Sequence, residues 1–231
     1  PLLPLAATLK GNYTLVASGQ PLPHFDLHCP VMSLPLAFKT TLETIPAEVP
    51  YLFADPARIA AWRTRLGPKS RMRVGVAWSG NPAHRNDRNR SIAVHLFAPL
   101  FELPVDFHVL QKEVPDADAA ELARFGNVQV HEGAIGDFAD SAALVQEMDL
   151  VIAVDTSTVH VAGALGKPCW VLLPFNPDFR WLLDRSDSPW YPTATLFRQH
   201  AIGDWSPVIA EVAARLGNFS QEVHALPGDN R

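Results

Sequence analysis

From residue 72 onward, apolar runs of strand length alternate with stretches that place apolar residues at helical spacing. The apolar runs are rich in Val, Ile and Leu, as is typical of parallel strands that are covered on both faces. This alternation predicts an α/β fold with a doubly wound parallel sheet, for which the common strand order is 3-2-1-4-5-6. The predicted strands are 72–78, 106–111, 128–131, 150–154, 169–174 and 194–199, and the predicted helices are 92–103, 116–126, 137–148, 157–166 and 205–217.

Before residue 70 the alternation is incomplete. Residues 13–18 and 25–32 have the composition of strands, and residues 3–9 that of a helix end. Residues 56–67 predict a helix that Asp55 caps and Gly67 ends. Two strands do not form a stable sheet of this type alone, so we expect the trailing part of a second α/β domain.

Two polar loops follow the first and fourth predicted strands, at 79–91 and 155–160. These strands become neighbours in the expected order, and open α/β sheets bind ligands where the order reverses. The start of the helix after residue 156 also offers free amide N–H groups to an anion. The alternative is that Asp155, Thr156 and Ser157 only cap a helix. The convergence of two polar loops on one place favours a ligand site.

The residue types in these loops suit a phosphate ligand. Gly80 allows a close approach of the backbone, and Arg85, Arg88 and Arg90 match phosphate oxygens unless they form a solvated basic loop. The hydroxyl groups after Asp155 and the side chain of His160 lie at the favoured end of a helix. Lys112, Glu113 and Glu132 end the two remaining strands of this half, where they would neutralise phosphate or bind hydroxyl groups, unless they are only surface charges.

Missing motifs and composition narrow the function classes. There is no G-x-G-x-x-G after the first strand and no G-x-x-x-x-G-K-[ST], which disfavours dinucleotide dehydrogenases and P-loop NTPases, and no G-x-S-x-G elbow. The histidines show no metal-ligand spacing, so we expect neither a metal nor a cofactor. The net charge of −5 gives no reason to expect nucleic-acid binding.

The remaining features concern location. No apolar run is long enough to span a bilayer, and the start has neither a basic region nor a methionine, which predicts no signal peptide and suggests a processed chain or a fragment. Cys29 and Cys169 are too few for a disulfide framework and fit a reducing cytoplasm.

Several segments together resemble a bacterial glycosyltransferase module that is often fused to tetratricopeptide repeats. They are VGVAWSGNPAHRNDRNRSI, LQKE, DFADSAALVQEMDLVIAVDTSTVHVAGALGKPCWVLLPF and DFRWLLDRSDSPWYPT. The module is similar to the ADP-heptose:lipopolysaccharide heptosyltransferase family and more distantly to O-linked N-acetylglucosamine transferases. The resemblance covers about residues 20 to 217, and DTSTVHVAGALGKP is its most specific part.

The resemblance implies the two-lobed GT-B fold. Residues 1–67 would be a partial amino-terminal, acceptor-side lobe with a linker helix, residues 68–217 a complete Rossmann-like lobe that binds the nucleotide sugar, and residues 218–231 a tail. The family's catalytic base lies near the start of the amino-terminal lobe, outside this chain. The segment DLHCPVMSLPLAF matches the end of that lobe, so His28 and Ser33 would face the cleft, with His28 the candidate base.

The resemblance also assigns roles in the donor lobe. Asp155 would contact the donor sugar, and Thr156 and Ser157 would hold the diphosphate, although the family usually has glycine at position 157. His160 matches a family histidine. The candidate donor and phosphate ligands are Ser79, Gly80, Arg88, Lys112, Asp155, Thr156, Ser157, Thr158 and His160, and the candidate sugar or nucleoside contacts are Glu113 and Glu132.

The expected function is transfer of a sugar from a nucleotide-diphosphate donor to a hydroxyl acceptor on a glycan, a lipid-linked glycan or a protein. The reaction would proceed with inversion and without a metal. One alternative is a non-catalytic module that binds a nucleotide sugar or docks partners for a repeat protein. Another is a sugar-nucleotide epimerase.

Overall fold

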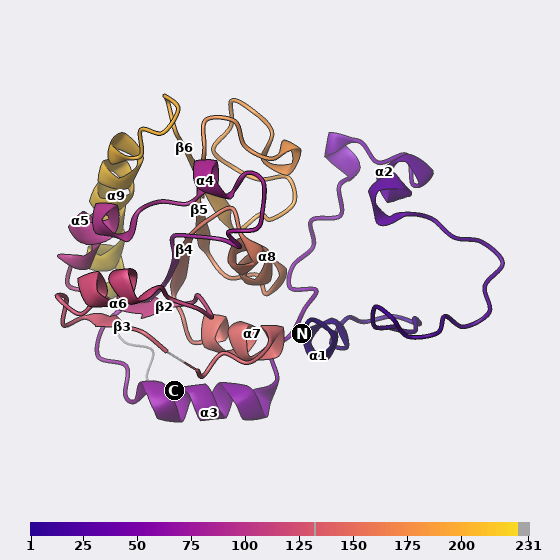
Figure 1. Ribbon diagram of the computed structural model, residues 1–231, viewed down its shortest axis with the longest axis horizontal. Helices are drawn as coiled ribbons and strands as arrows, with labels where there is room; N and C mark the ends of the chain where they lie inside the picture. Colours follow the sequence, from indigo (N-terminus) through magenta and orange to yellow (C-terminus); the bar gives the residue numbers. More distant parts are fainter. Residues whose placement is uncertain (132, 226–231) are drawn as a thin grey trace.

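The computed structural model describes residues 1–131 and 133–225, and its centre is a parallel sheet of six strands (Figure 1). The order β3-β2-β1-β4-β5-β6 confirms the predicted topology and the α/β fold class. Residues 72–78 and 150–154 pair as expected, since Val74 lies opposite Leu150. The strands are β1 (Arg73–Ala77), β2 (Asp106–Val109), β3 (Val128–Gln129), β4 (Leu150–Val154), β5 (Cys169–Leu173) and β6 (Ala194–Arg198).

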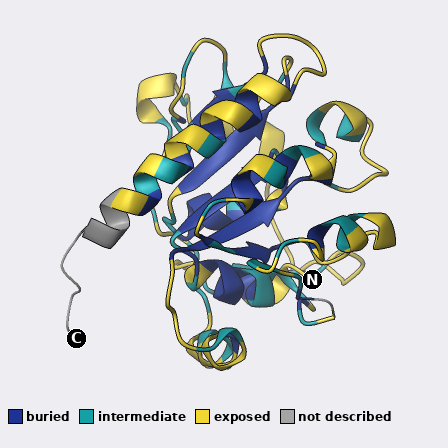
Figure 2. Ribbon diagram, turned by 90° about the vertical axis from the view of Figure 1, so that its left-hand side faces the viewer, coloured by how far each residue is buried: buried dark blue, intermediate teal, exposed yellow. Residues whose placement is uncertain are grey.

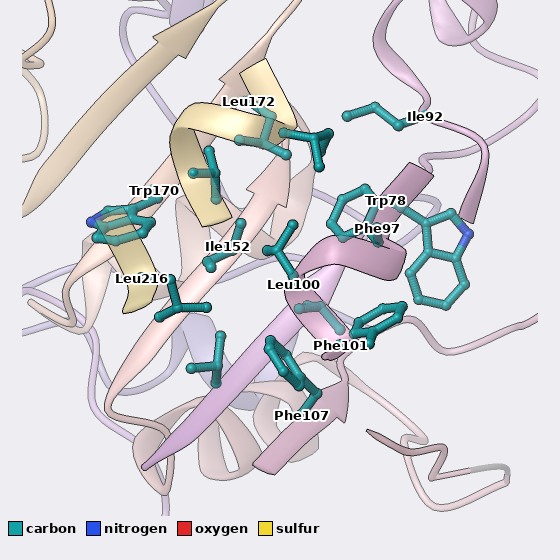
Figure 3. Close-up of a cluster of buried hydrophobic side chains, with 14 of the residues drawn as sticks. Trp78, Ile92, Phe97, Leu100, Phe101, Phe107, Ile152, Trp170, Leu172 and Leu216 are labelled. Atoms are coloured by element: carbon teal, nitrogen blue, oxygen red, sulfur yellow. The ribbon is translucent and has the colours of Figure 1, made fainter. Parts of the chain in front are cut away.

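One face of the sheet carries an aromatic core. Side chains from alternate positions of the strands, such as Phe107, Ile152 and Trp170, lie there in one buried cluster with Phe97 and Phe101 (Figure 3). The elements that cover this face are η3 (Val94–Phe97), α5 (Ala98–Phe101), α6 (Asp116–Leu122) and α9 (Ser206–Ala225). Figure 2 shows the pattern on α9, the long helix that leads to the C-terminus, which buries one side against the sheet and exposes the other.

The opposite face is covered by α1 (Leu3–Ala6), α3 (Pro56–Leu66), α7 (Phe138–Gln146) and α8 (Ser157–Ala164). Leu5 and Trp62 are buried in this second core. An ion-pair cluster also fixes α3 to the start of α7, because the Arg58 guanidinium lies 2.7 Å from Asp137 and 2.6 Å from Asp140. The predicted caps of α3 are confirmed: Asp55 accepts from the Arg58 amide, and Gly67 ends the helix with a φ of 71°.

The strands expected at 13–18 and 25–32 are wrong, because residues 1–55 contain no strand. A strand needs a partner for its backbone groups, and neither stretch has one. Between α1 and α3 the chain makes an excursion from the body with only η1 (Val31–Ser33), α2 (Leu34–Ala37) and η2 (Leu42–Thr44) as regular elements (Figure 1). The assignment of this segment to an amino-terminal lobe and the domain boundaries stay predictions.

Two helix predictions need correction. Instead of one helix over 92–103, the chain forms η3 and the short α5, because Pro99 lies in the first turn of α5 and has no amide N–H to continue a helix. A short helix, α4 (Asp87–Arg90), precedes them. The helix expected to end at 217 continues to Ala225, so the predicted tail begins as helix, and residues 226–231 lie outside the described residues.

A pair of buried histidines joins the sheet to α3. His108 Nδ1 on β2 lies 3.2 Å from His131 Nε2, and the rings stack with centroids 5.4 Å apart. The Trp62 ring meets His131 edge-on at 5.1 Å. Burial is the main cause that lowers the pKa of His108 to about 3 and the pKa of His131 to about 4. Both rings are therefore neutral at pH 7.

We predict that this pair makes the fold sensitive to mild acid. The unfolded histidines bind protons near pH 6.5, whereas the folded ones stay neutral to about pH 4. Stability is therefore complete above pH 6.5 and falls as the pH drops, by up to about 1.4 kcal/mol per pH unit for each histidine. Urea unfolding between pH 7.5 and 5 measures this loss. The double variant His108→Leu, His131→Phe should show a clearly smaller loss, and an equal loss would contradict the prediction.

Candidate functional site

A cavity of about 1050 Å³ lies at the carboxyl ends of β1, β2 and β4. The strand order reverses between β1 and β4, so the loops after these strands leave toward opposite faces of the sheet. Seven of the predicted site residues line this cavity together, from three separate loops. They are Ser79, Gly80, Lys112, Glu113, Thr156, Ser157 and Thr158.

Arg90 ties the loop after β1 to the loop after β4. Its Nη1 donates to the Asp155 carbonyl oxygen at 2.6 Å, and its Nε donates to Asp87 Oδ1 at 3.1 Å. The guanidinium lies directly against Gly80, where an added Cβ would be 2.3 Å from Nη2. The close approach predicted for Gly80 is therefore to an arginine side chain of its own loop.

Gln111 fixes the first turn of the same loop. Its Oε1 accepts from the backbone amides of Trp78 at 2.8 Å and Ser79 at 3.1 Å, and its Nε2 donates to the Ser79 hydroxyl at 3.0 Å. The Trp78 indole N–H donates to Asp118 at 2.7 Å. Ser79 is thus hydrogen-bonded to Gln111 through both its amide and its hydroxyl, and it helps to hold the cavity wall together. No pattern in the sequence indicates the role of Gln111, which depends on β1 and β2 being neighbours.

Thr156 begins α8 at the cavity wall. It is the N-cap residue, yet its hydroxyl does not cap the helix, and this buried oxygen has no hydrogen-bond partner. The residue is only 8% exposed. Buried hydroxyl groups are almost always paired, so an unpaired one beside free helix amides, at a cavity wall, makes this helix start a candidate contact for a ligand atom.

The start of α7 also lines this cavity but, unlike the start of α8, it is capped by a side chain. Asp137 accepts from the amides of Ala139 and Asp140, so the helix is capped by its own carboxylate. Lys112 reaches this side of the cavity and donates to the Gly136 carbonyl oxygen at 3.1 Å. Lys112 and Glu113 are both exposed at the cavity rim.

Asp155 and His160 do not line the cavity but form a pair beside it. His160 Nε2 lies 3.8 Å from Asp155 Oδ1, and its Nδ1 lies 3.1 Å from the Tyr191 hydroxyl. The His160 ring stacks on Trp181 at 5.6 Å. Burial lowers the pKa of His160, and the negative charge of Asp155 opposes that shift.

Three more of the predicted residues, Arg88, His28 and Ser33, do not line the cavity. Arg88 is exposed and does not line the cavity, whereas Arg90 does. No sequence pattern distinguishes two arginines that are two positions apart on a short helix. His28 is exposed in the amino-terminal excursion and, like Ser33, does not line the cavity. Glu132 lies outside the described residues.

The described residues contain neither a helix suited to span a membrane nor a cluster suited to a metal ion. None of their helices is long and apolar enough to cross a membrane. Within the same part of the chain, no three histidine, cysteine or acidic residues are grouped so as to hold a metal ion.

The chain is similar in sequence to Protein FlbA of Caulobacter vibrioides, with 29% identity over 206 residues. The match covers 85% of this chain and 34% of FlbA, so the chain spans about a third of that relative. No protein-family model matches the chain.

The fold resembles two solved structures. ADP-heptose lipopolysaccharide heptosyltransferase II of E. coli matches with a TM-score of 0.55 and 15% identity, over 80% of this chain and 58% of that chain. A family 9 glycosyl transferase of Veillonella parvula matches with a TM-score of 0.50 and 11% identity, over 74% and 52%. The chain therefore shares the α/β fold of these proteins, in agreement with the family resemblance of its motifs. Attached tetratricopeptide repeats are not shown.

We predict that Gly80→Ala destabilises the chain by about 1–3 kcal/mol, because the new methyl group displaces Arg90 from Asp87 and from the Asp155 carbonyl. Gly126→Ala is the matched control, since an added Cβ there meets nothing within 4 Å. The control should be neutral or stabilise by up to about 1 kcal/mol. Urea unfolding of both variants tests this, and equal stabilities would show that Arg90 moves aside freely.

Proposed function

We propose that the chain is the donor-binding part of a glycosyltransferase. It transfers a sugar from a nucleotide-diphosphate sugar to a hydroxyl group of a glycan, a lipid-linked glycan or a protein, with inversion and without a metal ion. The observation that carries this proposal is the unpartnered, buried Thr156 hydroxyl at the start of α8, on the wall of a cavity at the reversal of the strand order.

The cavity supplies what the chemistry of such a transfer needs. As the bond to the sugar breaks, the leaving nucleoside diphosphate gains negative charge. The free amides of α8, the hydroxyl groups of Thr156 and Ser157, and the cations of Arg90 and Lys112 stabilise that charge from fixed positions. A base deprotonates the acceptor hydroxyl from the other side.

The comparisons support the class of reaction. Both solved structures reported above are glycosyltransferases, and one acts with ADP-heptose. The chain spans 58% and 52% of them, so the activity of a whole protein, the base and the sugar of the donor, and the acceptor remain proposals. A cytoplasmic location and attached tetratricopeptide repeats, indicated by cysteine usage and motif resemblance, belong to the same proposal.

One observation favours the alternative of a binding module. Of the four carboxylates that line the cavity among the described residues, Asp87, Asp118 and Asp137 are engaged by Arg90, Trp78 and Arg58. The fourth, Glu113, is exposed at the rim. Among the described residues, the cavity therefore has no buried carboxylate that is free to act as a base, and on this alternative the chain binds nucleotide but turns over slowly. Product analysis separates the classes: a transferase yields a glycosylated acceptor, an epimerase a new nucleotide sugar, and a binding module neither.

We predict opposite effects of Thr156→Val on stability and on binding. The substitution removes an unpaired buried hydroxyl, so the free protein gains about 1 kcal/mol of stability. The same change removes a hydrogen bond to the diphosphate and weakens nucleotide binding by roughly 1.5–3 kcal/mol, which is more than tenfold. Thermal unfolding and calorimetry, with UDP, ADP and GDP as ligands, measure the two effects.

Thr193→Val is the matched control for Thr156→Val. The Thr193 hydroxyl is also buried without a partner, but the residue does not line the cavity. This variant should become more stable and bind nucleotide as the wild type does. Equal nucleotide affinity of wild type and Thr156→Val would remove the main support for the proposed phosphate site.

We predict that nucleotide affinity is unchanged by EDTA, because helix amides and cationic side chains take the place of a metal at the phosphates. Calorimetry with the nucleotide that binds most tightly, before and after chelation, makes the comparison. A tenfold loss of affinity, about 1.4 kcal/mol, would contradict a metal-independent site.

A further inference from the structure

A chain of polar side chains runs beside the cavity and joins three segments that are distant in sequence. The Tyr51 and Tyr191 hydroxyls lie 3.4 Å apart, and the Tyr191 hydroxyl lies 3.1 Å from His160 Nδ1. His160 Nε2 in turn lies 3.8 Å from Asp155 Oδ1. Neither Tyr191 nor Tyr51 lines the cavity itself.

The fold holds Tyr191 and His160 in place. The Tyr191 ring lies against α8 at Gly163, where an added Cβ would be 2.4 Å from the ring. His160 stacks on Trp181, which is only 1% exposed. The segment that carries Tyr51 is also bonded to α8, since the amides of Tyr51 and Leu52 both donate to the Ala164 carbonyl oxygen. The His160 ring therefore has one orientation.

This geometry decides which ring nitrogen of neutral His160 carries the proton. A carboxylate only accepts hydrogen bonds, so a lone pair on Nε2 would face the negative Asp155 and be repelled. A proton on Nε2 faces it favourably instead. Nδ1 then accepts from the Tyr191 hydroxyl, which stays protonated because burial raises the pKa of Tyr191. Tyr51 completes the chain by donating to Tyr191.

The other charged groups near His160 leave this assignment unchanged. Arg180 and Asp178, in the segment of η4 (Phe179–Trp181), act on His160 with opposite signs. Asp178 is itself paired with Arg180. Asp155 favours protonation of His160, and burial opposes it more strongly, so the ring is neutral at pH 7.

The spacing of His160 and Asp155 allows one hydroxyl group of a ligand to contact both. At 3.8 Å the two atoms are too far apart for a direct hydrogen bond. One hydroxyl oxygen to the side of the line that joins them, about 2.8 Å from each atom, accepts from Nε2–H and donates to the carboxylate. Both side chains are partly open to solvent, at 35% and 16% exposure. Asp155 directly precedes Thr156, and His160 follows it by about one helical turn. The pair therefore adjoins the proposed phosphate site.

We propose that Tyr191 is a positioning residue that holds His160 in its Nε2–H tautomer, so that His160 and Asp155 together bind one hydroxyl group of the donor sugar. This inference rests on the proposed function for its ligand. The tautomer itself does not depend on it.

The first test is nuclear magnetic resonance of the full chain labelled with ¹⁵N-histidine. Long-range proton–nitrogen spectra at pH 7.5 should show His160 as the Nε2–H tautomer. Tyr191→Phe keeps the ring on Gly163 but removes the hydroxyl, so it should give a mixture of tautomers and raise the pKa of His160, because the neutral ring loses its donor. Tyr13→Phe, in the amino-terminal excursion, is the matched control and should change neither. An Nδ1–H tautomer in the wild type, or no effect of Tyr191→Phe, would overturn the proposal.

The second test compares UDP, ADP and GDP with their glucose conjugates by calorimetry. Tyr191→Phe should weaken binding of the nucleotide sugar roughly three- to tenfold, the value of one hydrogen bond, and leave binding of the nucleoside diphosphate unchanged. Equal losses for both ligands, or no loss, would refute the role in sugar binding. If the wild type binds no nucleotide while the tautomer is as expected, the proposed function fails and the tautomer assignment stands.

Discussion

The parallel pairing of β1 with β4 is the constraint on which the site depends. Each of these strands is buried along its whole length, and Val74 to Ala77 lie opposite Leu150 to Ala153. Because the strand order reverses here, the following chain turns toward α4 on one side and α8 on the other, and a cavity is left between them. Arg90 spans the cavity wall and fixes the distance between the two loops through Asp87 and the Asp155 carbonyl.

The polar groups of the site fall into two sets. One set holds the cavity wall together, and the other is free to contact a ligand. Ser79, Gln111, Trp78 and Asp118 are bonded to one another and hold the wall. Thr156 stands apart because its buried hydroxyl is left unpaired, at a cost that folding alone does not recover. In the proposed function, a ligand atom in the cavity supplies the missing partner. Arg90 joins both sets, since it is bonded within the wall and also lines the cavity.

Much of the fold could be predicted from local patterns. The strand at 150–154 was predicted residue for residue, since a run of Leu, Val, Ile and Ala between polar loops fits a strand covered on both faces. The amino-terminal strands were wrong, because residues 13–18 have a suitable composition but no neighbouring strand. Composition is a local property, whereas pairing depends on the rest of the chain.

The site was predictable only in part, for the same reason. Its place at the strand ends follows from topology, and Thr156 follows from its position at a helix start. The choice between Arg88 and Arg90 depends on which side of a one-turn helix faces Asp155, and no periodic pattern indicates that. The roles of Gln111 and Tyr191 also depend on long-range contacts, to residues about 30 positions away in the chain.

The two helices that start at the cavity give it an uneven electric field. At α7 the partial positive charge of the free amides is offset by Asp137 and Asp140, and Arg58 neutralises only part of that pair. At α8 the first turn has no acidic residue and the cap hydroxyl makes no bond to the helix, so the amides keep their charge. Of the two helix starts, that of α8 is therefore the more favourable for an anion. A molecule with one anionic and one neutral end has, as a result, a single favoured direction of entry.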